Sequence, residues 1–243
     1  KDPRVIDHVR AVLKGRSSPS RYTQTAYHLA LMVNVGVDVL FGLMNMLDCF
    51  KVKLGHNLTE EMFLAVISIP GLDNAYYATD HFMCGSGSSM FLPLCSIDVV
   101  AHEVGHGVVQ RNAGLIYEGE SGALNEAFSD IIGATVEQYV YDKLNNNANP
   151  DDDILGEADW DIGEDLRKQF KVLRSMERPS STENPQPDRY EGQHWMDPRN
   201  TSQDYGGVHV NSGVWSRLYF LLQTKVGVDT AFKYMWQTLQ RLQ

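Results

Sequence analysis

A short run of side chains near the middle of the chain has the spacing of a metal site. Residues 102–106 read His-Glu-Val-Gly-His. On a helix, residues four apart share one face, so both imidazoles can reach a single ion. Glu103 stands beside them, close enough to hold a water molecule. The pattern also occurs by chance, and the alternative is an exposed helix with two ordinary histidines.

Two features of the surrounding sequence favour the metal site. The pattern lies in an apolar segment, where two unpaired histidines and a glutamate would be costly to bury. The next predicted helix offers Glu126, which can complete a His₂Glu set and leave the fourth zinc position for water. Asp130, one turn later, can accept the second ring N–H of a bound histidine. A solvated helix face is the alternative for both carboxylates, but Phe128 and Ile131 favour a partly buried helix.

More carboxylates are predicted to lie within a few turns of this set. Asp98 comes one turn before His102, and Glu137 comes about three turns after Glu126 on the same face. The segment DWDIGED at residues 159–165 adds further oxygen ligands. Such density suits calcium, because like charges so close together would repel one another without a cation. A solvated acidic turn is the alternative.

Helices and strands must position these side chains. Apolar periodicity predicts strands at 62–69 and 76–83, and helices at about 26–50, 98–112, 121–143, 208–222 and 228–243. Residues 1–25 are expected to be irregular, 84–89 a turn region, and 144–153 a surface loop.

The order of these elements predicts an α+β protein with two lobes. The strand-rich lobe, residues 1–112, ends in the helix that carries the two histidines. The mainly helical lobe, residues 113–243, supplies Glu126. We expect the active-site cleft to lie between them.

Composition limits the class of partner. The chain has 243 residues, 43% of them hydrophobic, and a net charge of −10, which is typical of a globular protein and argues against nucleic acid. The most apolar stretch, residues 29–50, contains two asparagines and two aspartates, so we expect a buried helix and no membrane partner. Both a Cys84–Cys95 disulfide and three free thiols, including Cys49, are compatible with the sequence. Nothing resembling a signal peptide opens the chain, so we expect a mature form or a fragment.

Three blocks of the sequence together resemble a known family. They are HEVGH at 102–106, GLIYEGESGALNEAFSD at 114–130 and GGVHVNSG at 206–213, and they resemble the thermolysin family of zinc metallopeptidases in order and spacing. The likeness covers about residues 74–222. It implies a two-lobed zincin, secreted and monomeric, that hydrolyses peptide bonds on the amino side of bulky hydrophobic residues. The metzincin pattern does not fit, because it requires Gly and His where Val109 and Asn112 stand.

The resemblance implies a role for each matched residue of the reactive centre. The implied zinc ligands are His102, His106 and Glu126, with Asp130 orienting a bound histidine. Glu103 is implied to polarise the attacking water and to pass its proton to the leaving amine. The implied oxyanion-stabilising residues are Tyr117 and His209, with Asp204 as the partner that orients and charges His209.

The same resemblance implies substrate and calcium residues. Asn74 and Ala75 are implied to bind the substrate main chain, and Arg174 a carbonyl beside the cleaved bond. The implied pocket for the side chain after that bond consists of Phe91, Leu94, Val99, Ile162 and Leu173. The implied calcium ligands are Asp98, Glu137, Asp159, Asp161 and Glu164, with Asp165 as a further candidate. The segment between Asp165 and Leu173 is short, so the family's further calcium site is not expected there.

Two other functions remain open at this stage. A metal-stabilised binding module that no longer turns over would hold zinc without peptidase activity, and the family's usual extension beyond both ends of this chain makes it a real alternative. Another zinc hydrolase acting on a small amide is the third reading. Asn74, Ala75 and Arg174 favour a peptide substrate over a small amide.

Overall fold

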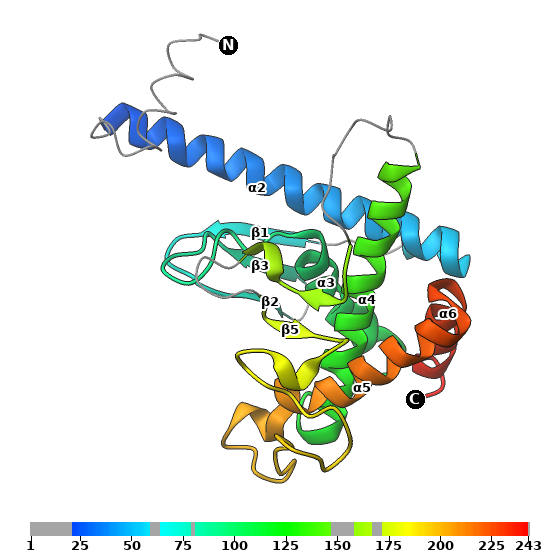
Figure 1. Ribbon diagram of the computed structural model, residues 1–243. Coiled ribbons are helices and arrows are strands. Elements are labelled where there is room, and N and C mark those ends of the chain that lie inside the picture. The colour runs from blue at the N-terminus through cyan, green and yellow to red at the C-terminus, as the bar shows by residue number, and fades with distance from the viewer. Residues whose placement is uncertain (1–20, 59–63, 79–80, 147–157, 167–171, 243) are drawn as a thin grey trace.

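The computed structural model describes residues 21–58, 64–78, 81–146, 158–166 and 172–242, with side chains from residue 32 onward. Its first part combines one long helix with a small sheet (Figure 1). Helix α2 (Arg21–Cys49) continues into a π-helical turn, η1 (Phe50–Leu54). Three strands follow: β1 (Leu64–Ile69), β2 (Ala75–Ala78) and β3 (His81–Gly85).

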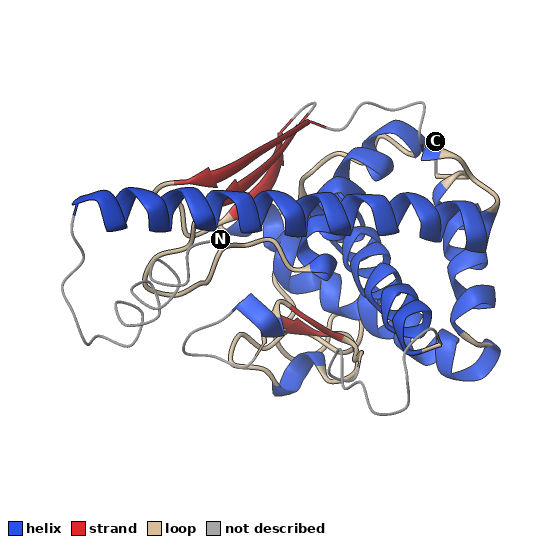
Figure 2. Ribbon diagram, turned by 90° about the horizontal axis from the view of Figure 1, so that it is seen from above, coloured by secondary structure: helices blue, strands red, loops and turns tan. Residues whose placement is uncertain are grey.

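The sheet has the order β1-β3-β2, with β1 parallel and β2 antiparallel to β3. Strand β2 is therefore an edge strand. Helix α2 runs along the sheet, as seen from above in Figure 2. Helix α3 (Ile97–Asn112) contacts both β2 and β3, so the unpaired edge of the sheet lies beside the helix that carries the two histidines.

The second part is mainly helical. Helix α4 (Gly119–Asn145) packs against both α3 and α5 (Asp204–Val226), and α6 (Val228–Leu239) follows after Gly227. Between α4 and α5 lie a two-stranded ribbon, β4 (Asp161–Ile162) with β5 (Arg174–Ser175), and two short 3₁₀ turns, η3 (Glu164–Leu166) and η4 (Pro179–Ser181).

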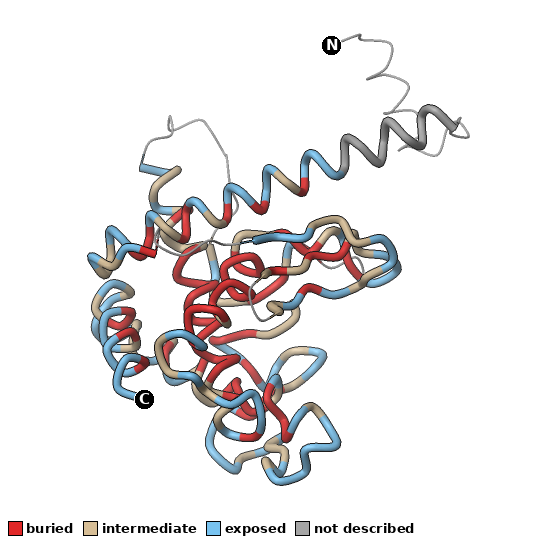
Figure 3. Tube along the Cα trace, turned by 180° about the vertical axis from the view of Figure 1, so that it is seen from behind, coloured by how far each residue is buried: buried red, intermediate tan, exposed pale blue. Residues whose placement is uncertain are grey.

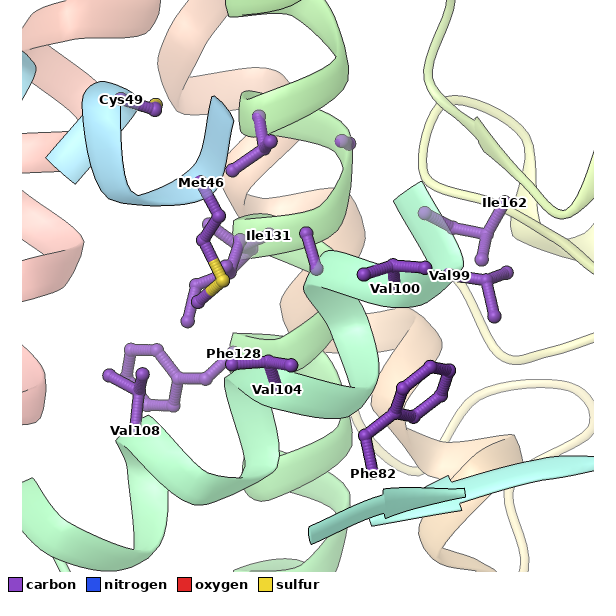
Figure 4. Close-up of a cluster of buried hydrophobic side chains, with 14 of the residues drawn as sticks. Met46, Cys49, Phe82, Val99, Val100, Val104, Val108, Phe128, Ile131 and Ile162 are labelled. Atoms are coloured by element: carbon purple, nitrogen blue, oxygen red, sulfur yellow. The ribbon is translucent and has the colours of Figure 1, made fainter. Parts of the chain in front are cut away.

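Burial is concentrated where α3, α4 and α5 meet (Figure 3). Helix α3 is mostly buried, and valine, alanine and glycine make up half of its residues. Its valines lie beside side chains from α2, β3, α4 and β4 (Figure 4). The central members of this core are Met46 from α2, Phe82 from β3, Val100, Val104 and Val108 from α3, and Phe128 and Ile131 from α4.

Glycines permit the close approach of α3 and α4. A Cβ at Gly133 would lie 2.6 Å from the main-chain oxygen of Asp98, and a Cβ at Gly105 would lie 3.2 Å from Ser129 Cα. Because a backbone atom cannot move aside as a side chain can, a larger residue at Gly133 would push the two helices apart. The separation that brings Glu126 to the histidines therefore depends on this glycine.

Most of the predicted elements are present. The helices predicted at 98–112, 121–143 and 208–222 correspond to α3, α4 and the regular part of α5. The last predicted helix ends earlier, at Leu239, and α2 begins at Arg21 within a segment that was expected to be irregular. The predicted surface loop at 144–153 falls largely outside the described residues. The lobe boundary at residue 112 stays a prediction.

One prediction about this region was wrong. The strand predicted at 76–83 is a hairpin, because Ala78 pairs with His81 and the chain reverses between them. By length and composition, the helical segment Met32–Leu54 is also apolar enough to cross a membrane. The buried side chains of Val35, Val39 and Met46 place one face of this segment in the core, which accounts for part of its apolar content.

The three cysteines are buried free thiols, so the disulfide is not formed in this structure.

Replacing Gly133 with alanine tests whether the close approach of α3 and α4 requires a glycine at this position. Alanine improves helix propensity by about 1 kcal/mol, whereas overpacking costs about 1–3 kcal/mol. We expect Gly133→Ala to lower the free energy of unfolding in urea. The matched control is Gly36→Ala in α2, whose Cβ would meet only the flexible end of Ile67 at 3.3 Å and should not destabilise the protein. Equal stability of the two variants would contradict the steric argument.

Candidate metal centre and binding cleft

Three side chains from α3 and α4 converge at one point. His102 Nε2 lies 3.5 Å from Glu126 Oε2, and His106 Nε2 lies 3.4 Å from Glu126 Oε1. Ligands bound to zinc at about 2.0–2.2 Å in a tetrahedron lie about 3.3–3.6 Å apart. The three side chains form a group that could hold a metal ion, and their spacing fits zinc.

The burial of Glu126 also points to a cation. Its side chain is fully buried, and its Oε2 has no hydrogen-bond partner in the part of the chain that the structure describes. A buried carboxylate oxygen is costly unless a charge compensates it. Burial by itself raises the pKa of Glu126, but the nearby His106, His209 and His102 lower it well below its usual value. The carboxylate is thus ionised and ready to accept a metal ion.

Both histidines are held by residues of α4. His102 Nδ1 lies 2.9 Å from Asp130 Oδ1, as the sequence predicted for one of the histidines. His106 Nδ1 lies 2.7 Å from Asn125 Oδ1 and 3.1 Å from Ser129 Oγ, a pair that the sequence analysis missed. With Nδ1 used in this way, each ring turns Nε2 toward Glu126.

Arg174 holds Asp130 in place through two hydrogen bonds. Its Nη2 donates to Asp130 Oδ1 at 2.6 Å and its Nε donates to Asp130 Oδ2 at 3.0 Å. Burial raises the pKa of Asp130, but the Arg174 guanidinium and His102 outweigh it and leave the pKa lowered. The arginine lines the cleft and also supports the metal centre through this carboxylate.

A second group of polar side chains, from the segment before α4 and from α5, faces Glu126. His209 Nε2 lies 3.1 Å from Tyr117 Oη and 3.4 Å from Glu126 Oε1, and Tyr117 Oη also donates to Glu126 Oε1. Burial and Glu126 raise the pKa of Tyr117, so its phenol stays protonated at neutral pH. Burial lowers the pKa of His209, but Glu126 and Asp204 raise it above its usual value.

A left-handed turn at the start of α5 aims His209. Asp204 Oδ1 lies 2.5 Å from His209 Nδ1, and Asp204 Oδ2 accepts the main-chain N–H of His209 at 2.9 Å. Four successive residues, Asp204 to Gly207, have positive φ. The two glycines are required there, because a Cβ at Gly206 would lie 2.4 Å from the main-chain oxygen of Pro198. This turn brings both the carboxylate and the imidazole to the cleft.

The cleft has a volume of about 650 Å³ and runs past Glu103, which is almost fully buried. All the residues predicted to bind substrate line it: Asn74, Ala75, Phe91, Leu94, Val99, Ile162, Leu173 and Arg174. Side chains that the sequence analysis did not single out line it as well, among them Tyr77, Gln110 and Tyr205. The structure thus brings together segments that are more than a hundred residues apart in the chain.

The chain matches two models of one known protein family. Residues 12–110 match a model described as the thermolysin metallopeptidase catalytic domain, and residues 113–242 match the thermolysin metallopeptidase alpha-helical domain. The chain belongs to the thermolysin metallopeptidase family.

Relatives in this family extend beyond the matched regions. The chain is 39% identical over 169 residues to neutral protease NprE of Bacillus pumilus, covering 69% of this chain and 49% of that protein. It is 35% identical over 209 residues to bacillolysin of Bacillus amyloliquefaciens, covering 84% of this chain and 36% of the relative. The chain therefore spans about half or less of these relatives.

A solved structure in the family is similar across most of the fold. It is the precursor of protealysin, a metalloproteinase from Serratia proteamaculans, with a TM-score of 0.70 and 28% sequence identity. The match covers 84% of this chain and 65% of that one.

One carboxylate outside the metal centre fixes the wall of the thermolysin-type cleft. Asp73 accepts hydrogen bonds from Ser88 N at 2.7 Å and from Phe91 N at 3.2 Å, as well as from Ser88 Oγ and Met90 N. Burial opposes ionisation, but these donors lower the pKa of Asp73 to about 2. Asp73 was not predicted from the sequence, although its place beside Asn74 was a signal.

The predicted calcium residues are only partly brought together. Glu137, Glu164 and Asp165 place carboxylate oxygens within 4.8 Å of one another. Burial and neighbouring carboxylates such as Asp98 raise the pKa of Glu137 to about 10 and that of Glu164 to about 8. Among the described residues, neither buried Oε2 of these two glutamates finds a hydrogen-bond partner. Such a cluster is what a divalent cation would stabilise.

The remaining predicted calcium ligands lie beside this group. Asp98 is fully buried and accepts a hydrogen bond from Gly163 N at 2.7 Å. Asp159 accepts the main-chain N–H of Asp161 at 2.8 Å. Neither Asp159 nor Asp161 belongs to the group of carboxylates that lie within 4.8 Å of one another.

Removing one metal ligand tests the centre directly. We expect the purified chain to retain one zinc per molecule after dialysis, measured by mass spectrometry of the metal. Glu126→Gln should lower zinc affinity by more than about 100-fold, the upper value seen when a mere outer partner is lost. His81→Gln, on β3 outside the cleft, is the control. Retention of zinc by the Glu126 variant at the control level would contradict the assignment.

Proposed function

We propose that this chain is the catalytic part of a zinc-dependent endopeptidase. One observation carries the proposal: the His102, His106 and Glu126 group shares a single cleft with Glu103 and with the Tyr117–His209 pair. A metal group alone would also suit a structural site. The addition of a buried carboxylate and two polar donors around the same point is typical of hydrolysis.

Zinc would be held by His102, His106 and Glu126. When bound there, it supplies a water of lowered pKa, about 7, and polarises a carbonyl group. Asp130, Asn125 and Ser129 orient the two imidazoles so that Nε2 of each points to the ion.

The other residues of the cleft handle the proton and the new charge. Glu103 accepts the proton of the attacking water and passes it to the leaving amine. Tyr117 and His209 donate to the oxyanion, and each such donor contributes about 3–4 kcal/mol. The raised pKa of His209, with Asp204 on its Nδ1 side, keeps Nε2 protonated and therefore a donor.

The substrate would be an extended peptide. Strand β2 is an edge strand whose residues Ala75–Ala78 line the cleft, so a peptide can pair with its backbone. The apolar wall formed by Phe91, Leu94, Val99, Ile162 and Leu173 would take a bulky hydrophobic side chain. We infer cleavage on the amino side of that residue, by a secreted, monomeric enzyme that acts on peptides or proteins and binds neither nucleic acid nor membrane.

The Glu103→Gln variant separates hydrolysis from metal binding. Glutamine cannot accept the proton, so we expect zinc content to stay at one per chain while hydrolysis of casein falls by at least about 10²–10⁴-fold. Glu177→Gln, on the exposed loop after β5, is the matched control. Wild-type turnover by the Glu103 variant would refute the mechanism. Bound zinc with no hydrolysis by the unaltered chain would favour a metal-stabilised binding module instead.

We also propose that Glu137, Glu164 and Asp165 bind calcium, with Asp98, Asp159 and Asp161 nearby. A ligand at 100 times its Kd stabilises a protein by about 2.7 kcal/mol, which corresponds to several degrees in Tm. Calcium should therefore raise the Tm of the unaltered chain, and much less that of Glu137→Gln. Magnesium at equal ionic strength and the Glu177→Gln variant are the controls. If calcium raised the Tm of Glu137→Gln as much as that of the unaltered chain, the carboxylates would be a solvated acidic turn.

A further inference from the structure

Tyr205 has a backbone conformation that is unfavourable for its side chain. It lies in the left-handed turn before α5, with φ 49° and ψ 35°. Glycine and asparagine adopt this region readily, whereas a bulky residue there is an outlier that costs about 1–3 kcal/mol. The turn is needed to place Asp204 and His209, but a glycine or asparagine at position 205 would form the same turn at a lower conformational cost. The turn therefore does not explain why a tyrosine ring stands at this position.

The ring of Tyr205 lies in the cleft. It is 59% exposed and lines the same cavity as the metal centre. It meets the ring of Tyr117 edge to face, with centroids 5.9 Å apart and an interplanar angle of 64°. Tyr117 in turn contacts His106 and His209. The exposed face of Tyr205 thus continues an aromatic surface that begins at the reactive centre.

The two oxygens of Glu126 show which end of the cleft this surface occupies. Oε2 faces His102 and Arg174, and Arg174 pairs in the ribbon with Ile162 of the apolar wall. Oε1 faces His106, His209 and Tyr117. Through its contact with Tyr117, Tyr205 therefore belongs to the Oε1 side of Glu126, whereas Arg174 and the apolar wall next to it belong to the Oε2 side.

Helix α3 gives the same order along the cleft. Val99, in the apolar wall, and Gln110, at the other end, both line the cavity and are separated by about 16 Å along the helix axis. Tyr77 lies against the helix near Gln110, since a Cβ at Gly107 would be 2.7 Å from Tyr77 Cζ. A peptide whose residue after the cleaved bond enters the apolar wall must lead its preceding residues toward this end.

We propose that Tyr205, together with Tyr117, forms an aromatic subsite that selects an aromatic or large apolar side chain at one of the two positions before the cleaved bond. The inference rests on the proposed function, which places the residue after that bond in the apolar wall. Aromatic rings bind such side chains edge to face or stacked, and the half-exposed ring of Tyr205 has a free face for this contact.

The test compares peptides that differ at the positions before the cleaved bond. All carry leucine after the bond, and phenylalanine or alanine at each of the two preceding positions. For the zinc-loaded unaltered chain, we expect kcat/KM for phenylalanine to exceed that for alanine about tenfold at one position. Tyr205→Asn removes the ring and tolerates the left-handed backbone, and it should reduce this ratio to less than about twofold. Tyr205→Phe keeps the ring and should keep the ratio.

A second ratio excludes general disruption of the cleft. Preference for leucine over alanine after the cleaved bond depends on the apolar wall, so it should be the same in Tyr205→Asn and the unaltered chain. A third measurement needs no turnover: the Kd of the same peptides for zinc-loaded Glu103→Gln with and without Tyr205→Asn. We expect the phenylalanine preference in Kd to disappear with the ring.

The outcomes separate this inference from the proposed function. Hydrolysis with a phenylalanine preference that Tyr205→Asn leaves unchanged overturns the aromatic subsite and keeps the peptidase. Absence of hydrolysis, with a ring-dependent preference in Kd, keeps the subsite and overturns the peptidase. Absence of both overturns both. A loss of the leucine preference in parallel with the phenylalanine preference would show that Tyr205 acts on the fold, and would also overturn the inference.

Discussion

The structure depends on one costly interaction, the burial of the Glu126 carboxylate between α3 and α4. A fully buried charge of this kind is stable only where opposite charges and donors surround it. Here His102, His106, Tyr117 and His209 all face it. Because three elements must meet at one carboxylate, the position of each helix is constrained to within the reach of a side chain. Glycine at the α3–α4 contact makes this separation possible.

Outer carboxylates extend the same principle. Asp130 links His102 to Arg174, and Asp204 links His209 to the first turn of α5. Each pairs a buried or partly buried cation with an anion, so charge is balanced across the cleft as well as at its centre. At the second cluster the negative charges are not balanced by cations, because Glu137 and Glu164 face other carboxylates. The donor types are the basis for proposing different metals: two imidazoles with one carboxylate suit zinc, whereas carboxylates alone suit calcium.

Much of the site was predictable because its residues lie at helical spacing on two continuous helices. The 102–106 pattern and Glu126 needed only the 3.6-residue period and the ligand chemistry of zinc. The hairpin at Ala75–Gly85 was missed, since the apolar residues on both sides of Thr79 and Asp80 were taken as one strand. Ribbon β4–β5 was missed because two-residue strands carry no periodic signal. Asp73 was missed because most of its partners are main-chain N–H groups.

The sequence by itself determined the ligand types, their order and the helices that carry them, since these follow from local periodicity and from chemistry that each residue brings alone. Only the tertiary structure decided which side chains share the cleft. Asn125 and Ser129 could be assigned to His106, and Tyr205 to Tyr117, only after α3, α4 and α5 were packed. Distances across the cleft depend on how closely helices approach, and that approach is set by side-chain volumes from distant parts of the chain, which no local pattern records.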